Sequence, residues 1–263
     1  MIGKIRTLNN KAFGLVMSLF VKSFADDPTL ASRISELEDE SFPQFLNEEP
    51  TWQQTQDAIL KNFAHYHYFI LNDENKTVGI NINVPLCWDG SPEDLPGYNE
   101  LLLRCLEEYE DGAKPTALVG IFGAVAPDSQ GQGITKLFLR QNSKLTRDHS
   151  MTNYLSPVRP AIKQFYPTFT FDEFLCWRDK NGGLIDPWLN SFVKLGAKNL
   201  GIAYDSITVT ASLKKWTEWT GLEFPVSGDY VIPGGHRPLA VDAVEDTGRY
   251  GEDHLWFDIP LFD

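Results

Sequence analysis

Hydrophobic and polar residues follow two different periods along the first part of the chain. Alternation in Lys4–Leu8 predicts a strand, and apolar residues three or four positions apart after Asn10 predict a helix that Asn10 caps. The apolar face of that helix would comprise Phe13, Val16, Met17, Phe20 and Phe24. Pro28 would end it, and a second helix is expected through Ile34 and Leu37.

The middle of the chain alternates between helix and strand patterns. Thr51 can cap a further helix, and Tyr66–Leu71 and Val78–Val84 predict a hairpin across a polar turn. The elements expected next are a helix at Tyr98–Tyr109, a strand at Ala117–Ala126, a helix at Ile134–Arg147, a strand at Tyr154–Val158, a helix at Pro187–Leu195 and a strand at Ser206–Ala211. Gly120 and Gly123 predict either a bulge or a close approach of another molecule to the backbone.

The end of the chain has a different composition. After Leu222 it is rich in glycine, proline and aspartate, which predicts loops with at most short strands. Helices followed by strand pairs in the earlier part favour an α+β fold.

Acidic residues outnumber basic ones, and this balance narrows the choice of partner. The net charge is −13, with seven acids and no base from Glu36 to Asp57 and eight acids beside Arg104 from Asp89 to Asp111. Such a surface repels phosphate backbones and anionic lipids, so we expect neither nucleic acid nor a membrane as a partner. The acidic stretches are either solvated faces or regions that attract a cationic, amine-bearing acceptor.

Cysteine and histidine residues do not form a metal-binding pattern. The three cysteines lack paired spacing, and His65 and His67 alternate on an expected strand without a third ligand nearby in the sequence. We therefore expect no metal. The chain has no apolar run of about 18 residues and no basic-apolar-small signal at its N-terminus, so we expect a cytoplasmic protein.

The segment from Val125 to Leu137 carries the chemistry that the sequence makes visible. A strand that passes through a glycine-bearing turn into a helix presents free N–H groups and the positive end of the helix dipole to an anion. A Walker A motif would need Lys where Ile134 stands, and the dinucleotide fingerprint would need glycine at Lys136. The residues leave two interpretations open, an anion site and a turn that binds nothing.

This segment resembles motif A of the GNAT superfamily of N-acetyltransferases, in which a strand ending V-x-P leads to Q/R-x-x-G-x-G/A and a helix. Gln130, Gly133 and Ile134 occupy matching positions, whereas Thr135 stands where Gly or Ala is usual. The resemblance implies a mixed, mostly antiparallel central sheet flanked by helices. It places a GNAT-like domain at residues 1–211, with insertions near 87–115 and 160–185, and a loop-rich C-terminal extension at 212–263 packed on the same domain.

The resemblance also implies an acyl-CoA site without a covalent nucleophile. The backbone near Gly123 and Val125 would pair with the pantetheine arm, and the thioester would lie between the strands at Ala117 and Tyr154. The pyrophosphate would bind the backbone amides of Gln130, Gly131, Gln132, Gly133, Ile134 and Thr135.

The chain departs from the family pattern at the residue that usually protonates the leaving thiolate. Phe192 stands where the family has tyrosine, in an element that otherwise resembles Y-x-x-x-G-F. Tyr166 in the inserted segment either supplies the missing phenol or packs in a cluster with Phe165, Phe169 and Phe171. Arg159 either contacts a CoA phosphate or the oxyanion, or forms a surface ion pair.

The function implied by the resemblance is acyl transfer from acyl-CoA, with acetyl-CoA as the first choice, to a small-molecule amine. A related possibility is a GNAT-like enzyme that acts on acyl groups tethered to an acyl carrier protein. Because Phe192 replaces the usual tyrosine, a non-catalytic acyl-CoA-binding module is the third interpretation.

Overall fold

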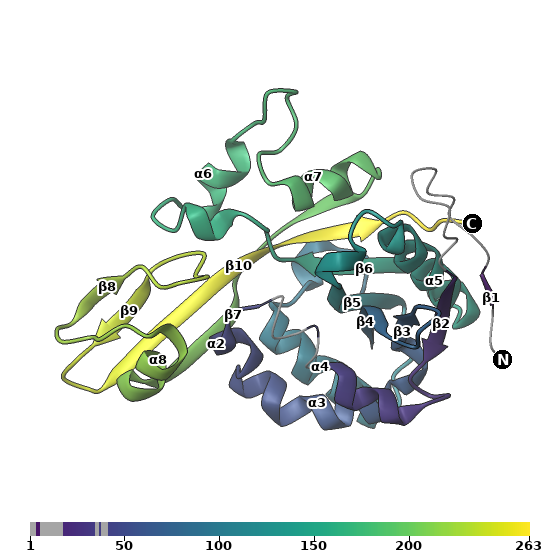
Figure 1. The fold of residues 1–263 in the computed structure, drawn as a ribbon, viewed down its shortest axis with the longest axis horizontal. Coiled ribbons are helices and arrows are strands. Elements are labelled where there is room, and N and C mark those ends of the chain that lie inside the picture. The colour runs from purple at the N-terminus through teal and green to yellow at the C-terminus, as the bar shows by residue number, and fades with distance from the viewer. Residues whose placement is uncertain (1–3, 6–17, 35–36, 38–41) are drawn as a thin grey trace.

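The computed structural model describes residues 4–5, 18–34, 37 and 42–263, and the strands in these ranges form one ten-stranded sheet (Figure 1). The strands are β1 (Lys4–Ile5), β2 (Leu19–Ser23), β3 (Tyr68–Leu71), β4 (Thr77–Leu86), β5 (Ala117–Val125), β6 (Asn153–Val158), β7 (Lys198–Ser212), β8 (Gly228–Tyr230), β9 (Leu239–Asp242) and β10 (Thr247–Ile259). The α-helices are α2 (Gln44–Asn47), α3 (Pro50–Asn62), α4 (Tyr98–Glu110), α5 (Ile134–Asp148), α6 (Phe171–Cys176), α7 (Pro187–Lys194) and α8 (Leu213–Thr220). Short 3₁₀ helices are η1 (Pro28–Arg33), η2 (Ala64–Tyr66), η3 (Pro92–Asp94), η4 (Pro127–Ser129) and η5 (Lys163–Phe165).

The sheet is mixed and mostly antiparallel. Its order is β1-β2-β3-β4-β5-β6-β10-β9-β8, and β7 pairs with β10. β5 and β6 pair in parallel, and the other neighbouring strands pair antiparallel. Because Leu255–Asp258 pair with both β6 and β7, β10 lies between these two strands. The predicted α+β fold, with a mixed central sheet flanked by helices, is confirmed.

Helices cover both faces of the sheet, so its central strands are buried on both sides. On β3, Phe69 packs in a core with residues of α3 and α4, whereas the next residue, Ile70, packs in a core with residues of α5 and α7. This alternation follows from the two-residue period of a strand. All of β4 is buried, which is typical of a central strand in a three-layer arrangement.

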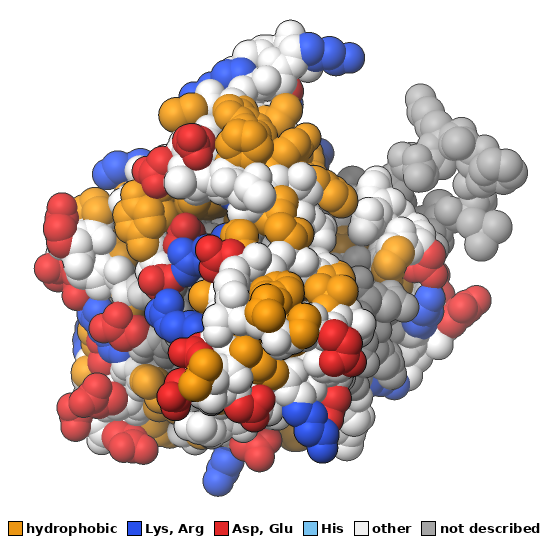
Figure 2. All heavy atoms as spheres, turned by 90° about the vertical axis from the view of Figure 1, so that its left-hand side faces the viewer, with side chains coloured by type: hydrophobic (Ala, Val, Ile, Leu, Met, Phe, Trp, Pro, Cys, Tyr) orange, Lys and Arg blue, Asp and Glu red, His pale blue; other side chains and the backbone are white. Residues whose placement is uncertain are grey.

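A separate core joins the C-terminal strands to α2. Trp216 of α8 and Tyr250 of β10 pack against Phe45 of α2, with ring centroids 5.5 and 4.9 Å from that of Phe45. Figure 2 looks onto the side that carries β8, β9 and α8, and acidic side chains are spread over much of it. No helix in the described ranges is long and apolar enough to cross a membrane.

Most of the predicted central elements are confirmed. The hairpin is β3 and β4, and the helices predicted after Thr51, at Tyr98 and at Ile134 are α3, α4 and α5. The N-cap of α3 is Glu49 rather than Thr51, because the Glu49 carboxylate accepts hydrogen bonds from the first free amides. The predicted helix at Pro187 is α7, and Gly196 just after it has the left-handed φ of 83° that suits a helix terminus.

Two of the predicted elements are wrong. The helix expected from Asn10 to Phe24 lies partly outside the described residues, but its last part is β2, which pairs with β3. The C-terminal region was expected to hold at most short strands, yet β10 spans 13 residues inside the sheet. In both places, pairing with a partner strand decides the backbone conformation over the local sequence preference.

Two elements predicted near the N-terminus lie partly outside the described residues. Lys4–Ile5 of the expected first strand is β1, and its remaining residues lie outside the described ranges. The expected second helix begins as η1 at Pro28, and most of the residues after Ile34 also lie outside them.

Candidate active site

The turn before α5 presents a group of unpaired backbone amides. Gly131 and Gly133 adopt left-handed φ values of 77° and 83°, which glycine reaches without a steric penalty. Within the described part of the chain, the N–H groups from Gln130 to Thr135 have no hydrogen-bond acceptor. α5 is 15 residues long, and its dipole adds positive potential at this end. The turn can therefore hold a pyrophosphate-sized anion with few basic side chains.

β5 carries a β-bulge close to the point where it separates from β6. The register against β4 shifts by one residue between Ile82 and Asn83, which leaves Ile121 as the extra residue of β5. The predicted bulge is therefore confirmed. A side chain at Gly120 would place its Cβ 2.5 Å from the phenol oxygen of Tyr154, so the close approach at that glycine comes from the protein itself.

The parallel strands β5 and β6 diverge toward their carboxyl ends. Their pairing covers Ala117–Val119, and beyond it the Ser156 hydroxyl donates to the carbonyl of Gly120 at 2.9 Å. Farther along, the edge of β5 that includes Gly123 and Val125 has no strand beside it among the described residues. A free strand edge offers main-chain donors and acceptors to an extended ligand.

A buried polar network fixes α5 against the sheet. The Tyr68 hydroxyl donates to Asn142 Oδ1 at 2.9 Å, and Asn142 Nδ2 donates to the Tyr154 hydroxyl at 2.6 Å. Burial raises the pKa values of both tyrosines, so both phenols stay protonated. Because the network links β3, α5 and β6, it holds the amide turn in place relative to the diverging strands.

Tyr166 follows η5 in the segment predicted as an insertion. Its ring packs against Trp177 and Phe174, with centroid distances of 5.0 and 6.1 Å. Of the expected neighbours, Phe171 belongs to the same core, whereas Phe165 is 70% exposed. The Tyr166 hydroxyl has no hydrogen-bond partner in the described ranges, so its role as an acid stays a prediction.

Phe192, at the usual tyrosine position, is a core residue of α7. It stacks on Phe257 of β10 with an interplanar angle of 14° and meets Trp188 edge-on. Buried in this way, the ring stabilises the contact between α7 and the sheet.

Arg159 follows the last residue of β6 and forms an ion pair with Glu252. Its Nε donates to Glu252 Oε1 at 2.8 Å, and a terminal nitrogen donates to the carbonyl of Gly234 at 3.0 Å. The pair is not at the surface, because the Glu252 side chain is fully buried. Contact between Arg159 and the acyl donor stays a prediction.

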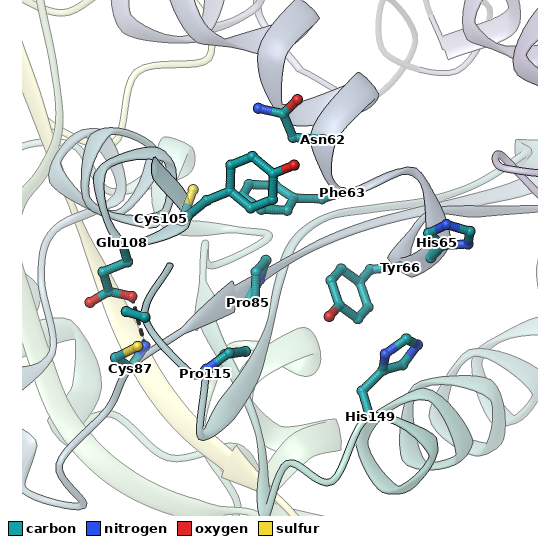
Figure 3. Close-up of a pocket in the computed structure, with 12 residues that line it drawn as sticks. Asn62, Phe63, His65, Tyr66, Pro85, Cys87, Cys105, Glu108, Pro115 and His149 are labelled. Carbon is teal, nitrogen blue, oxygen red and sulfur yellow. Dashed lines mark hydrogen bonds between the residues drawn. The ribbon is translucent and has the colours of Figure 1, made fainter. Parts of the chain in front are cut away.

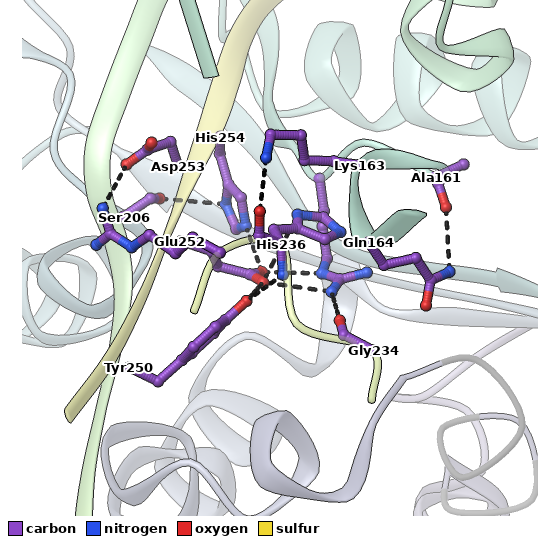
Figure 4. Close-up of polar contacts among 12 residues, drawn as sticks. Ala161, Lys163, Gln164, Ser206, Gly234, His236, Tyr250, Glu252, Asp253 and His254 are labelled. Carbon is purple, nitrogen blue, oxygen red and sulfur yellow. Dashed lines mark hydrogen bonds and ion pairs between the residues drawn. The ribbon is translucent and has the colours of Figure 1, made fainter. Parts of the chain in front are cut away.

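Glu252 is the centre of a buried polar cluster that the sequence did not reveal (Figure 4). Its carboxylate accepts from the Tyr250 hydroxyl at 2.8 Å and lies 3.2 Å from Nε2 of His254. Burial is the largest influence and would raise the pKa of Glu252, but the charge of Arg159 and the hydrogen bond from His254, with other nearby groups, together hold the pKa well below its ordinary value. Tyr250, Glu252 and His254 alternate in the sequence, and this two-residue period was the available signal for a polar strand face.

Two other ionisable groups join this cluster from neighbouring segments. The buried Lys163 ammonium donates to the carbonyls of Tyr166 and His236, at 2.9 and 2.6 Å, and burial lowers its pKa to about 8. His236 is 3% exposed, and burial lowers its pKa to about 3, so its ring is neutral at physiological pH. Neither of its ring nitrogens has a hydrogen-bond partner in the described chain. Leaving a buried polar group unpaired costs on the order of 1–3 kcal/mol.

Two cavities lie at opposite ends of the parallel strands. The smaller, about 170 Å³, is lined by residues such as Tyr66, Cys105 and His149 and lies near Pro115, before the start of β5 (Figure 3). The larger, about 340 Å³, is lined by Lys163, His236 and Glu252 among others. β6 ends opposite Leu255, so Glu252 lies beyond its carboxyl end. The amide turn follows the carboxyl end of β5, so the larger cavity and the turn lie at the same end of this strand pair.

The prediction that His65 and His67 are strand residues is wrong, because neither lies in a strand. His65 lies in η2, and His67 is buried just before β3, with Nε2 3.1 Å from the Ile59 carbonyl oxygen. In the described ranges no group of three or more His, Cys, Asp or Glu side chains is arranged to hold a metal ion.

Known proteins that resemble this chain include an N-acetyltransferase and GNAT-like domains. The arginine N-acetyltransferase avaD of Aspergillus versicolor is 27% identical, over 84% of this chain and 85% of that protein. The loading GNATL domain of CurA from Lyngbya majuscula superposes with a TM-score of 0.57 at 12% identity, over 93% of this chain and 98% of that one. The GphF GNAT-like decarboxylase, solved in complex with isobutyryl-CoA, has a TM-score of 0.56 at 14% identity, over 92% and 99% of the two chains. No family model matches the sequence.

The two solved structures share the fold of this chain, and the curated relative extends the likeness to the sequence over most of its length. The glycine turn before α5 and the diverging strands β5 and β6 agree with the resemblance to the GNAT superfamily. The chain has the fold of the GNAT superfamily, and its likeness to an N-acetyltransferase over most of its length indicates an N-acyltransferase.

Proposed function

We propose that the protein transfers an acyl group from acyl-CoA, with acetyl-CoA as its donor, to the amine of a small molecule by direct attack on the thioester. The observation that carries the proposal is the set of unpaired amides from Gln130 to Thr135 at the start of α5. Backbone amides at a helix N-terminus can donate hydrogen bonds to a pyrophosphate. Direct attack of the amine on the thioester needs no covalent intermediate with the enzyme.

The residues present fit the whole donor. Amides of Gln130 to Thr135 would hold the pyrophosphate, and the free edge of β5 at Gly123 and Val125 would pair with the pantetheine arm. The thioester would then reach the divergence of β5 and β6. Tyr166 would protonate the departing sulfur, and Arg159 would act near the reacting end of the donor. Positioning and a placed proton donor together account for most of the acceleration that such an enzyme supplies.

The acceptor we propose is an amine of an amino acid such as arginine. The support comes from the curated relative, which is named for arginine, and from the net charge of −13, which attracts cationic molecules. Carrier-protein-bound acyl groups are the related donor; the likeness to the CurA loading domain is a likeness of fold and leaves this donor to experiment.

A second candidate function is acyl-CoA binding without turnover. It is favoured by Phe192, which stands in the core where the family has its tyrosine.

The test is release of free CoA from acetyl-CoA with a panel of amines that includes L-arginine, compared with release from an acetylated carrier protein. We expect amine-dependent release from acetyl-CoA above hydrolysis without amine. If the protein binds acetyl-CoA but releases no free CoA with any acceptor, the result would contradict acyl transfer and support a non-catalytic acyl-CoA-binding module.

A further inference from the structure

The larger cavity carries ionisable side chains of both signs. Its volume of about 340 Å³ lies at the lower end of the range for small-molecule sites, roughly 300–1,000 Å³. The ionisable residues that line it are Lys163, Asp172, His236, Arg237, Glu252 and Asp253. It therefore suits a compact ligand with both positive and negative groups. The smaller cavity, at about 170 Å³, lies below that range and at the other end of the strands.

His236 lines this cavity, and its two ring nitrogens have no hydrogen-bond partner among the described residues. The imidazole is buried and lines the cavity, and its Nδ1 lies 3.7 Å from Glu252 Oε2, beyond hydrogen-bond distance. One nitrogen of the neutral ring is an acceptor, and the nearby Glu252 carboxylate, whose charge opposes the lowering of the His236 pKa by burial, would stabilise the ring when it takes a proton. Figure 4 shows this ring between Glu252 and Lys163.

The charged lining offers partners for two ends of a ligand. Two of the three N–H donors of Lys163 are used by carbonyls, so one remains for an anion. On the acidic side, Asp172 accepts from the Tyr204 hydroxyl at 2.9 Å, and Asp253 lies 3.8 Å from Arg237. Each carboxylate can accept further hydrogen bonds from a cationic group. Glu252 is already neutralised by Arg159 and is not needed for this role.

We propose that this cavity is the acceptor site, that it binds an amino acid whose carboxylate contacts Lys163 and whose side chain is cationic, and that His236 accepts the proton of the attacking amine. This inference rests on the acyl transfer proposed above. The amine nitrogen forms a bond to the thioester carbon while the carbon–sulfur bond breaks and its electron pair leaves on sulfur. The amine loses one proton to His236 Nδ1 or Nε2, and the sulfur gains one from the donor proposed at Tyr166, so protons balance.

The first experiment separates the role of His236 from a structural one. His236→Asn removes the proton acceptor, and kcat for CoA release should fall about 10²- to 10⁴-fold. The affinity for L-arginine should change by less than about tenfold, because the ring is one of several contacts. His67→Asn is the matched control: it also removes a buried imidazole with a lowered pKa, but at the edge of α3 and β3, outside the cavity. Its kcat per folded protein should stay at the wild-type value.

The second experiment tests ligand recognition without catalysis. Calorimetry on the wild-type protein, without acyl donor, should show L-arginine binding about ten- to a hundredfold more tightly than agmatine, which lacks the carboxylate, because a charge-assisted hydrogen bond is lost. Lys163→Met should remove this difference by weakening L-arginine and leaving agmatine unchanged.

The outcomes divide the two proposals. A His236→Asn enzyme with kcat close to wild type, or equal binding of arginine and agmatine to the wild type, would overturn the acceptor site. A wild-type protein that releases no CoA with any amine would overturn the proposed function and the role of His236 with it. The calorimetric comparison would still decide whether the cavity selects a carboxylate.

Discussion

At the scale of residues, the site combines groups with fixed protonation states in a small volume. Arg159 keeps Glu252 ionised although the carboxylate is fully buried, and burial keeps His236 neutral. Removing one partner of a buried ion pair typically costs 3–5 kcal/mol, so Arg159 contributes to stability whatever else it contacts. The exposed Lys144–Asp148 pair, between consecutive turns of α5, belongs to a class worth about 0–1 kcal/mol.

The prediction at this scale concerns the hydroxyl of Tyr166. Tyr166→Phe keeps the ring packed against Trp177 and Phe174 and removes the proposed acid, so kcat should fall about 10²- to 10⁴-fold with little change in CoA affinity. Steady-state CoA release measures it. Tyr230→Phe, which removes a hydroxyl bonded to the Val226 carbonyl near β8, is the control and should keep full activity. Unchanged turnover in Tyr166→Phe, or loss of folding, would make the phenol structural.

At the scale of elements, one helix terminus and one strand edge form the proposed donor site. The turn before α5 leaves its amides free, and β5 leaves β6 after Val119. The bulge at Ile121 and the network of Tyr68, Asn142 and Tyr154 hold these two elements in register. The turn and the strand edge are therefore held in place by the protein's own contacts.

The prediction at this scale is loss of donor binding in Gly133→Asp. A carboxylate at the N-terminus of α5 repels a pyrophosphate, so the rise in melting temperature that acetyl-CoA gives the wild type should disappear. Saturation at a hundred times Kd corresponds to about 2.7 kcal/mol, which a thermal-shift assay resolves readily. Gly112→Asp introduces the same charge at a similar left-handed φ, 67°, after α4, and should keep the shift. A shift that persists in Gly133→Asp would place the donor elsewhere.

At the scale of the whole molecule, net charge affects which partners can approach, and the sheet topology joins the separate cores. The net charge of −13 opposes the binding of polyanions, and Figure 2 shows acidic side chains spread among basic and hydrophobic ones. The single strand β10 contributes both to the core beside α3 and α4 and to the core around Trp216. Residues 212–263 therefore contribute to the central sheet as well as packing against it.

The prediction at this scale is that the protein retains neither duplex DNA nor anionic vesicles at physiological salt. Repulsion between like charges persists within about 8 Å of the surface at this ionic strength. Gel shift and vesicle co-sedimentation provide the measurements. Retention that weakens as salt is added would reveal a basic surface that the net charge conceals.

The sequence by itself determined the features that depend on neighbouring residues. The hairpin β3–β4, the helices α4 and α5 and the strand β5 follow from periodicity, and the glycine turn follows from the left-handed conformation that Gly131 and Gly133 permit. Free amides before a helix are a local property as well, which is why the sequence alone could predict an anion site there.

Tertiary structure decided what depends on residues far apart in the chain. β2 pairs with β3 against a helical pattern, and β10 enters the sheet from a region whose composition predicts loops. Arg159 and Glu252 are 93 positions apart, and the local sequence around either gives no sign of the other. The cavity around His236 exists because four segments meet beyond the end of β6, and a buried charge is stable only where such a meeting supplies its partner.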